Sequence, residues 1–362
     1  MTTTPRRVHQ VLATLGYGDA IGHEVLGIQR ALRAAGFESE IFVETADRRL
    51  EALTRDYREL IEESRPDQLL IHHFSIGSRA SRVAYALPDR MALVYHNITP
   101  PEYFIGVHKR LVELCYHGRR ELRAYVGRVA LALGDSEYNR QELAALGFAP
   151  TGVMPIAVNT RRVTDAPPRP ALERVLAEEG WANFLFVGRI APNKRIEDHI
   201  KLAEVYKRYV DEEYRFVFVG RHDTVPSYYA AIRQLMLEFK MPEERFWFTG
   251  PVPDEDLATY YRAARVYVSL SEHEGFCVPL LEAMAADVPV LAYAAGAVSE
   301  TLGGAGVTFA PKDLEFAAEL LGELAYDDDL RARVIAGQRA RLPAFGDEAI
   351  TAGLERLVGR FA

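Results

Sequence analysis

The chain has 362 residues, of which 49% are hydrophobic and 26% charged, with a formal net charge of −8. This length predicts two domains, the mixture excludes wholesale disorder, and the acidic balance excludes a general nucleic-acid binder. The two cysteines, Cys115 and Cys277, lack metal or redox spacing, and no signal sequence or apolar run of roughly 18 residues is present, so we expect a cytoplasmic protein.

Short apolar runs alternate with longer amphipathic segments along the whole chain. Alternation of this kind is typical of parallel sheets with helices on both faces. The predicted strands form two series: Val8–Leu15, Glu40–Val43, Gln68–His72, Met91–Tyr95 and Val129–Leu133, then Asn183–Val187, Arg215–Val219, Arg245–Thr249, Arg265–Leu270, Val288–Ala292 and Gly306–Phe309.

A polar segment with three prolines, Thr160–Ala171, separates the two series and has the composition of a linker. One continuous sheet would need about eleven strands, more than twisted open sheets usually hold. The sequence therefore predicts an α/β protein of two Rossmann-like domains, 1–160 and 172–340, facing each other across a cleft. Because ligands bind beyond the carboxyl ends of parallel strands, functional residues are expected there.

The strongest such segment is Glu274–Ala285, which follows a predicted strand and opens a helix. Pro279 suits the first helical turn, and Gly275 permits a tight turn before it. The backbone amides of Phe276, Cys277 and Val278 then predict an anion site suited to a diphosphate. Glu274 and Glu282 face the same region, although both could simply offset the helix dipole.

A second segment, Gly188–Lys194, follows the first strand of the second series and places Arg189 and Lys194 on one short loop. A guanidinium fork and an ammonium point charge are a common pairing around phosphates. The alternative is an ordinary solvated loop without a binding role, because basic loops are frequent.

Together these segments resemble the donor-binding half of family 4 retaining glycosyltransferases, which have the GT-B fold. The resemblance covers Phe184–Phe309. It rests on Gly-Arg-x4-Lys at Gly188–Lys194, Phe218-Val219-Gly220, Phe248-Thr249-Gly250-Pro251-Val252, Glu-x7-Glu at Glu274–Glu282, and Val288–Ala292 followed by Gly296. The chain departs from many relatives at Gly220-Arg221-His222, where they have a small glycine-rich turn.

The resemblance implies a metal-independent enzyme without a cofactor, which transfers a hexose from a nucleotide-diphosphate sugar to a hydroxyl acceptor. It makes 172–340 the donor domain and 1–160 the acceptor-side domain, with 341–362 as a helix crossing back to the first. Arg189 and Lys194 are expected to bind the diphosphate, Glu282 the ribose hydroxyls and Val252 the base side. Glu274 and the amides of residues 275–278 are expected to hold the transferred sugar. The first donor expected is GDP-mannose, with UDP-glucose close behind.

In the first half, Gly16, Gly18 and Gly22 precede a helix with spacing that fits an NAD fingerprint poorly. The family has a glycine-rich loop here, so Gly16 and Gly18 are expected near the donor. Relatives also carry a histidine like His96 that contacts the transferred sugar. One of His72 and His73 is expected to face the cleft.

Three further segments carry charged or capping residues that the resemblance does not assign. We expect Asp135-Ser136 and Asp327-Asp328-Asp329 to cap helices rather than to bind ligands. The basic stretch Lys109–Arg128 is either a solvated helix face or a peripheral contact with an anionic membrane.

Two other functions share this architecture: a nucleotide-sugar 2-epimerase and a non-catalytic nucleotide-sugar-binding protein. The epimerase is disfavoured because acidic residues after the strands of the first half are sparse. The full set of Arg189, Lys194, Glu274 and Glu282 argues against a protein that has lost catalysis.

Overall fold

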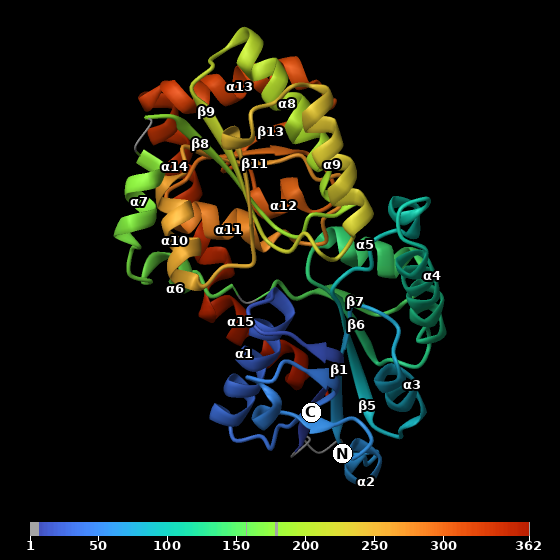
Figure 1. Cartoon of the computed structure of the whole chain (residues 1–362). Helices are drawn as coiled ribbons and strands as arrows, with labels where there is room; N and C mark the ends of the chain where they lie inside the picture. The colour runs from blue at the N-terminus through green and yellow to red at the C-terminus, as the bar shows by residue number, and fades with distance from the viewer. Residues whose placement is uncertain (1–6, 157, 178–179, 362) are drawn as a thin grey trace. The chain divides into compact units, whose positions relative to one another are not determined.

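The computed structural model describes residues 7–156, 158–177 and 180–361. The chain divides into two compact units (Figure 1). The first comprises Met1–Glu102, Lys109–Val158 and Ala344–Ala362, and the second Tyr103–His108 and Asn159–Pro343. Residues 1–6, on which the expectation of no signal sequence partly rests, lie outside the described residues.

The first unit is built on a seven-stranded parallel sheet with strand order β3-β2-β1-β4-β5-β6-β7. Its strands are β1 (Val8–Leu15), β2 (Ile41–Ala46), β3 (Arg55–Asp56), β4 (Leu69–Phe74), β5 (Arg90–Tyr95), β6 (Leu131–Gly134) and β7 (Thr151–Val153). Its helices are α1 (Ala20–Ala34), α2 (Leu60–Glu63), α3 (Arg79–Ala86), α4 (Lys109–Ala124), α5 (Glu137–Ala145) and α15 (Asp347–Gly359).

The second unit repeats the plan with a six-stranded parallel sheet of order β10-β9-β8-β11-β12-β13. Its strands are β8 (Ala182–Val187), β9 (Tyr214–Val219), β10 (Phe246–Gly250), β11 (Val266–Ser269), β12 (Val290–Tyr293) and β13 (Val307–Phe309). Its helices are α6 (Arg161–Thr164), α7 (Pro170–Ala177), α8 (Ile196–Tyr209), α9 (Pro226–Glu238), α10 (Asp254–Ala263), α11 (Val278–Ala285), α12 (Val298–Leu302), α13 (Leu314–Tyr326) and α14 (Asp328–Arg341).

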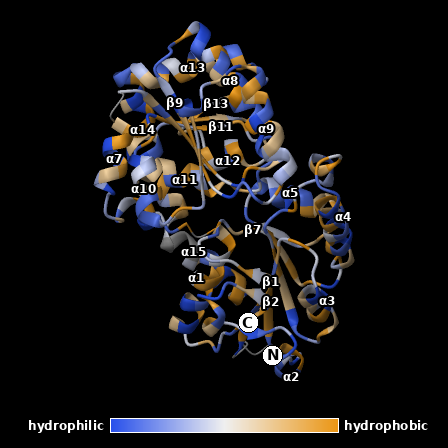
Figure 2. Cartoon of the chain, in the orientation of Figure 1, coloured by the Kyte–Doolittle hydropathy of each residue, from blue (hydrophilic) through white to orange (hydrophobic). Residues whose placement is uncertain are grey.

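Helices cover both faces of each sheet (Figure 1), so the central strands are largely buried and mostly apolar (Figure 2). In the second unit every residue of β9 is buried. In the first unit, Leu354, Leu357 and Phe361 of the C-terminal segment are buried in one core cluster with Val8 of β1 and Val94 of β5. The last segment of the chain thus completes the core of the unit formed by its beginning.

The α/β architecture with two Rossmann-like sheets is confirmed, and each of the eleven predicted strands overlaps an observed one. Strands β3 and β7 were not predicted, because they have only two and three residues and carry no apolar run. Among the described residues, none of the helices combines the length and the apolar character that crossing a bilayer requires.

Candidate functional site

In the second unit, an ion pair connects the loop after β8 to the loop after β11. Lys194 ends the short 3-10 turn Pro192–Lys194, and its Nζ donates a hydrogen bond to Oε1 of Glu274 at 2.6 Å. The two side chains are only 17% and 8% exposed. Asn193 reinforces the contact, because its Nδ2 donates to the carbonyl of His273 at 3.2 Å. The ammonium and the carboxylate are therefore held together where two parallel strands end.

The turn that carries Glu274 leads directly into α11. Gly296 allows its close packing, because a Cβ at Gly296 would lie 2.4 Å from the carbonyl oxygen of Glu274. Cys277 takes a left-handed conformation (φ 73°), and α11 begins at Val278 with Pro279 in its first turn, as the sequence predicted.

The first backbone amides of a helix lack partners within the helix, so the start of α11 concentrates positive potential. The predicted anion-binding residues Gly275, Phe276, Cys277 and Val278 lie directly before and at this start, with Phe276 and Cys277 buried. They directly follow Glu274 in sequence, so the amides at the start of α11 and the Lys194 ammonium both place positive potential near this buried carboxylate.

Glu282 lies one turn further along α11 and is nearly fully buried. Its Oε2 accepts a hydrogen bond from the Tyr261 hydroxyl at 3.0 Å, and its Oε1 lies 3.4 Å from Nε of Arg162. Burial raises the pKa of Glu282, and the nearby guanidinium opposes that rise. Arg162 also pairs with Asp254, at 3.3 Å, so one guanidinium links the start of α10 to the carboxylate of α11.

The remaining predicted donor residues of this unit are more open. Arg189 is exposed on the loop after β8, and Val252 is half-buried after β10. In the divergent segment after β9, Arg221 pairs with Asp223 at 3.0 Å and the ring of His222 lies 4.7 Å from that of Tyr229.

A hollow of about 650 Å³ also marks this unit, lined by residues that include Trp181, Lys207 and Arg245. Those residues precede β8, β9 and β10, at the edge of the sheet opposite to Lys194 and Glu274. It is therefore separate from the predicted donor residues.

In the first unit, the glycine-rich turn after β1 is organised around Asp19. Asp19 caps α1 by accepting a hydrogen bond from the amide of Gly22 at 2.6 Å. A Cβ on Gly16 would collide with the Asp19 carboxylate, at 2.1 Å, and Gly18 has a left-handed φ of 76°. The glycines thus make room for a capped helix start, and Tyr17 between them is exposed.

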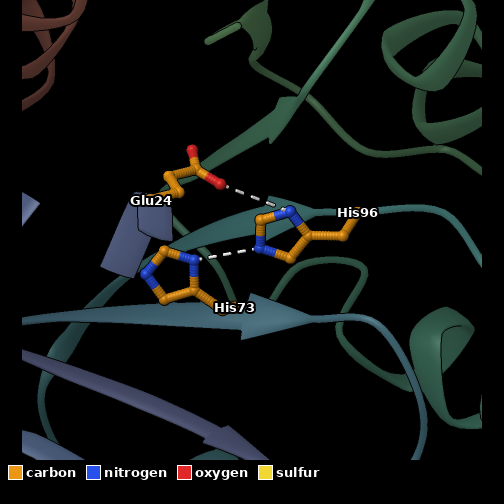
Figure 3. A group of neighbouring side chains, drawn as sticks. All are labelled: Glu24, His73 and His96. Atoms are coloured by element: carbon orange, nitrogen blue, oxygen red, sulfur yellow. Dashed lines mark hydrogen bonds and ion pairs between the residues drawn. The ribbon is translucent and has the colours of Figure 1, made fainter. Parts of the chain in front are cut away.

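His96 follows β5 and is the centre of a buried polar cluster (Figure 3). Its Nε2 lies 3.0 Å from Nδ1 of His73, and its Nδ1 lies 3.0 Å from Oδ2 of Asp135 and 3.5 Å from Oε2 of Glu24. His73 in turn contacts Oε1 of Gln10 through Nε2, at 2.9 Å. The His96 side chain is 1% exposed, so in this structure both ring nitrogens face protein atoms.

Burial and charge act in opposite directions on this cluster. Burial alone lowers the pKa of His96, but Asp135 and Glu24 outweigh it and raise that pKa to about 9. Burial raises the pKa of Glu24 to about 8 and also raises that of Asp135. Burial and the charge of His96 hold the pKa of His73 well below its ordinary value. The arrangement favours one imidazolium next to two competing carboxyl groups.

These contacts correct two sequence interpretations. Ser136 does cap α5, but Asp135 does not, because its carboxylate turns to His96 instead. The argument that carboxylates are sparse at this edge also fails, because Asp135 and Glu24 both reach it. The capping interpretation is right for Asp327, which accepts from the amide of Leu330 at 2.8 Å.

The structure also shows residues that the sequence did not single out: Glu24, Gln10, Arg162, Asn193 and Tyr261. Glu24 lies inside a helical pattern and Arg162 inside a segment with linker composition, so neither follows a predicted strand. Of the two uncertain histidines, His73 joins His96, whereas His72 contacts Ser81 at 3.2 Å.

Two Rossmann-like parallel-sheet units, each with charged side chains beyond its strand ends, place the chain among the two-domain α/β proteins. Residues 171–341 match the family described as "Glycosyl transferases group 1". Over 98% of the chain the fold is similar to sucrose-phosphate synthase from Thermosynechococcus elongatus (TM-score 0.73, 20% identity, 98% of that chain). It is also similar to HepE from Anabaena solved in complex with UDP-glucose (TM-score 0.74, 15% identity, 98% of this chain and 99% of that one).

Among curated proteins, the chain is 26% identical over 272 residues to O-antigen chain mannosyltransferase B of Escherichia coli, covering 73% of this chain and 68% of the relative. It is 33% identical over 196 residues to a D-inositol 3-phosphate glycosyltransferase of Xylanimonas cellulosilytica, covering 53% and 46%. It is 34% identical over 125 residues to a GDP-mannose-dependent alpha-mannosyltransferase of Mycolicibacterium smegmatis, covering 34% and 29%. Residues 171–341 thus match the group 1 glycosyltransferases, the chain as a whole has the GT-B fold, and the curated relatives named here are glycosyltransferases, which supports the family 4 resemblance.

Proposed function

We propose that this enzyme is a retaining, metal-independent hexosyltransferase that moves mannose from GDP-mannose to a hydroxyl of a glycan, a glycolipid or a small molecule. The observation that carries the proposal is the Lys194–Glu274 pair at the start of α11. Similarity to two mannosyltransferases, one named as GDP-mannose-dependent, supports the choice of donor. The relatives found are named as transferases, so the epimerase and the non-catalytic protein are not favoured.

In the proposed reaction, the diphosphate leaves while negative charge builds on it. Lys194, Arg189 and the first amides of α11 stabilise that charge without a metal ion. The acceptor attacks from the face that the diphosphate leaves, and the departing phosphate takes the acceptor proton. Glu274 supports the positive charge that develops on the sugar, and Glu282 accepts hydrogen bonds from the ribose hydroxyls. Gly16, Gly18, Val252 and His96 keep their expected donor contacts as parts of this proposal.

A contact with an anionic membrane surface belongs to the same proposal. Lys109, Arg110, Arg120 and Arg123 of α4 are exposed, as are Leu114 and Tyr116. Arg119 and Arg128 are engaged within the unit instead, with Glu142 and with the carbonyls of Tyr85 and Leu87. The exposed cations and apolar groups of one helix suit the interface of a bilayer.

The test is steady-state kinetics on Glu274→Gln and Glu282→Gln, with release of the nucleotide diphosphate measured with and without candidate acceptors. Glu282 would bind ribose equally in the ground and transition states, so its loss should raise KM. Glu274 would act where charge develops, so its loss should lower kcat. The exposed Glu319 of α13 supplies the control variant Glu319→Gln. If both variants melt normally and keep kcat and KM like the control, the site assignment is wrong.

The anomeric configuration of the product, followed by NMR from the first turnovers, tests the retaining outcome separately. Inversion would refute the mechanism while leaving the donor site intact. Comparison of GDP-mannose with UDP-glucose under the same conditions tests the choice of donor, and faster transfer from UDP-glucose would overturn it.

A further inference from the structure

The hydrogen bonds of the first unit fix the direction in which protons are donated along the cluster. Nε2 of Gln10 donates to the carbonyl of Val25 at 3.0 Å, which leaves the amide Oε1 as an acceptor. Nε2 of His73 must therefore carry a proton to contact that oxygen. Because buried His73 is neutral, its Nδ1 can only accept, and Nε2 of His96 donates to it.

The other nitrogen of His96 faces the two carboxyl groups. An imidazole binds a proton more tightly than a carboxylate by more than two pKa units in water, so the proton between His96 and Asp135 belongs on Nδ1. His96 is then a cation that donates from both ring nitrogens. Two carboxylates cannot both stay charged in one buried site without a second cation, and both oxygens of Glu24 lack a hydrogen-bond partner. One carboxyl group must therefore be neutral.

A metal ion fits this geometry poorly. Glu24, His73 and His96 each offer a ligand atom, and these atoms lie within 4.8 Å of one another. However, Glu24 lies on the Nδ1 side of His96 and His73 on the Nε2 side, so an ion on either ring nitrogen would have only one of them within reach (Figure 3). The second nitrogen of His73 is already bound to Gln10. The side chains of the cluster form a chain of hydrogen bonds that all donate in defined directions, and they do not surround a site for an ion.

We propose that Glu24 and Asp135 together carry a single negative charge and act as interchangeable counterions that keep the His96 imidazole protonated, so that both are positioning residues for the turn His96–Asn97. The charged and titratable groups that face His96 are Glu24 on α1, Asp19 before it, His72 and His73 on β4, and Asp135 after β6. Glu24 lies slightly further away than Asp135, which suits it to hold the proton while Asp135 holds the charge.

The turn that this cluster holds is at the ligand-binding edge of the sheet. Asn97 has a left-handed φ of 69°, and its Nδ2 donates to Oδ1 of Asn139 at 2.7 Å. Because the His96 ring is buried while the residue as a whole is half-buried, its backbone is the part that reaches the surface. A fixed ring on one side of the turn and a fixed amide on the other orient that backbone. Its contribution to turnover rests on the proposed transferase function.

The protonation state is measured by NMR of the full chain labelled with 15N in its histidines, at pH 7.5 and through an alkaline titration. The wild-type protein should show His96 as an imidazolium that titrates at about pH 9, with His72 and His73 as neutral internal references. Assignment uses the loss of one signal in His96→Asn. A neutral His96 at pH 7.5 in the wild type would overturn the proposal without any variant.

Three variants then test whether the counterions are interchangeable. Glu24→Gln and Asp135→Asn should each keep the imidazolium at pH 7.5, because the remaining carboxylate ionises. The double variant should lose it, with the pKa of His96 falling below 6.5. Asp89→Asn, which alters a carboxylate buried elsewhere in this unit, is the matched control and should change nothing at His96. Loss of the cation in either single variant, or its survival in the double variant, refutes the proposal.

Activity provides a separate readout. At pH 7.5 the single variants should keep kcat within about threefold of the wild type, and the double variant should lose at least tenfold in kcat. If no sugar transfer is found with any donor, the proposed function fails while the NMR outcome still decides the protonation of His96. If the double variant does not fold, the single variants and the wild-type titration decide it.

Discussion

Replacing Lys194 by Met removes the cation from a buried pair and is expected to destabilise the second unit. At the 2.6 Å contact and an effective dielectric constant of about 20, the attraction in the pair is at most about 6 kcal/mol. Desolvation offsets much of that attraction in the native pair. Breaking a buried pair nevertheless costs about 3–5 kcal/mol, because the other charge is left without compensation. The free energy of unfolding should fall by that amount.

The two tryptophans of the chain, Trp181 and Trp247, both lie in the second unit, so their fluorescence during urea denaturation reports on that unit. Lys201→Met is the control, because Lys201 is 44% exposed and pairs with Asp198 at 3.6 Å. Exposed pairs contribute at most about 1 kcal/mol. Adding Glu274→Gln to Lys194→Met removes the stranded charge and should recover most of the loss.

The single variant Lys194→Met should also weaken binding of a nucleotide diphosphate. A hydrogen bond to a charged group contributes about 1.5–3 kcal/mol, which corresponds to about 10- to 150-fold in Kd. Equal stability losses in Lys194→Met and Lys201→Met, or no recovery in the double variant, would show that Lys194 does not compensate a buried charge on Glu274. Unchanged nucleotide affinity would remove the loop Gly188–Lys194 from the diphosphate site.

Other predictions concern the rest of the molecule. Arg189→Ala should weaken nucleotide binding without lowering the urea midpoint, because the side chain is exposed; a matching loss of stability would contradict this. EDTA should leave transfer intact, and activity restored only by a divalent ion would contradict the metal-free mechanism. Burial lowers the pKa of His72 to about 3 and of His9 to about 4, so the unfolded state gains protons that the native state does not. The contribution of these two histidines to stability is therefore complete above pH 6.5 and should be lost below it by about 1.4 kcal/mol per pH unit for each of them, and His9→Phe should remove the part of this slope that His9 causes. Arg120→Glu with Arg123→Glu should reduce cosedimentation with anionic vesicles but not with neutral ones, and equal binding by the wild type to both would exclude an electrostatic contact.

The sheets could be predicted because their central strands are largely buried on both faces and therefore appear in the sequence as short, mostly apolar runs. The segment Glu274–Glu282, which we propose binds the donor, could be singled out because a strand end, a glycine and a helix start follow one another there in sequence. What the sequence could not supply is which side chains meet. Lys194 and Glu274 are 80 residues apart, and their contact depends on β8 and β11 being neighbours in a strand order that composition does not determine.

The polar cluster of the first unit shows the same limit more sharply. His73, His96 and Asp135 end three consecutive neighbours in the sheet, β4, β5 and β6, so their proximity follows once the strand order is known. The position of Glu24 in the cluster does not follow from the strand order, because nothing in a helical pattern distinguishes a buried glutamate from the solvated glutamates that such helices usually carry. Its burial becomes explicable only when the cation it faces is seen. A carboxyl group is tolerated at this buried position because it can be protonated and neutral. Because the same group can ionise when Asp135 does not, the fold keeps a counterion beside His96 and thereby keeps its imidazole charged.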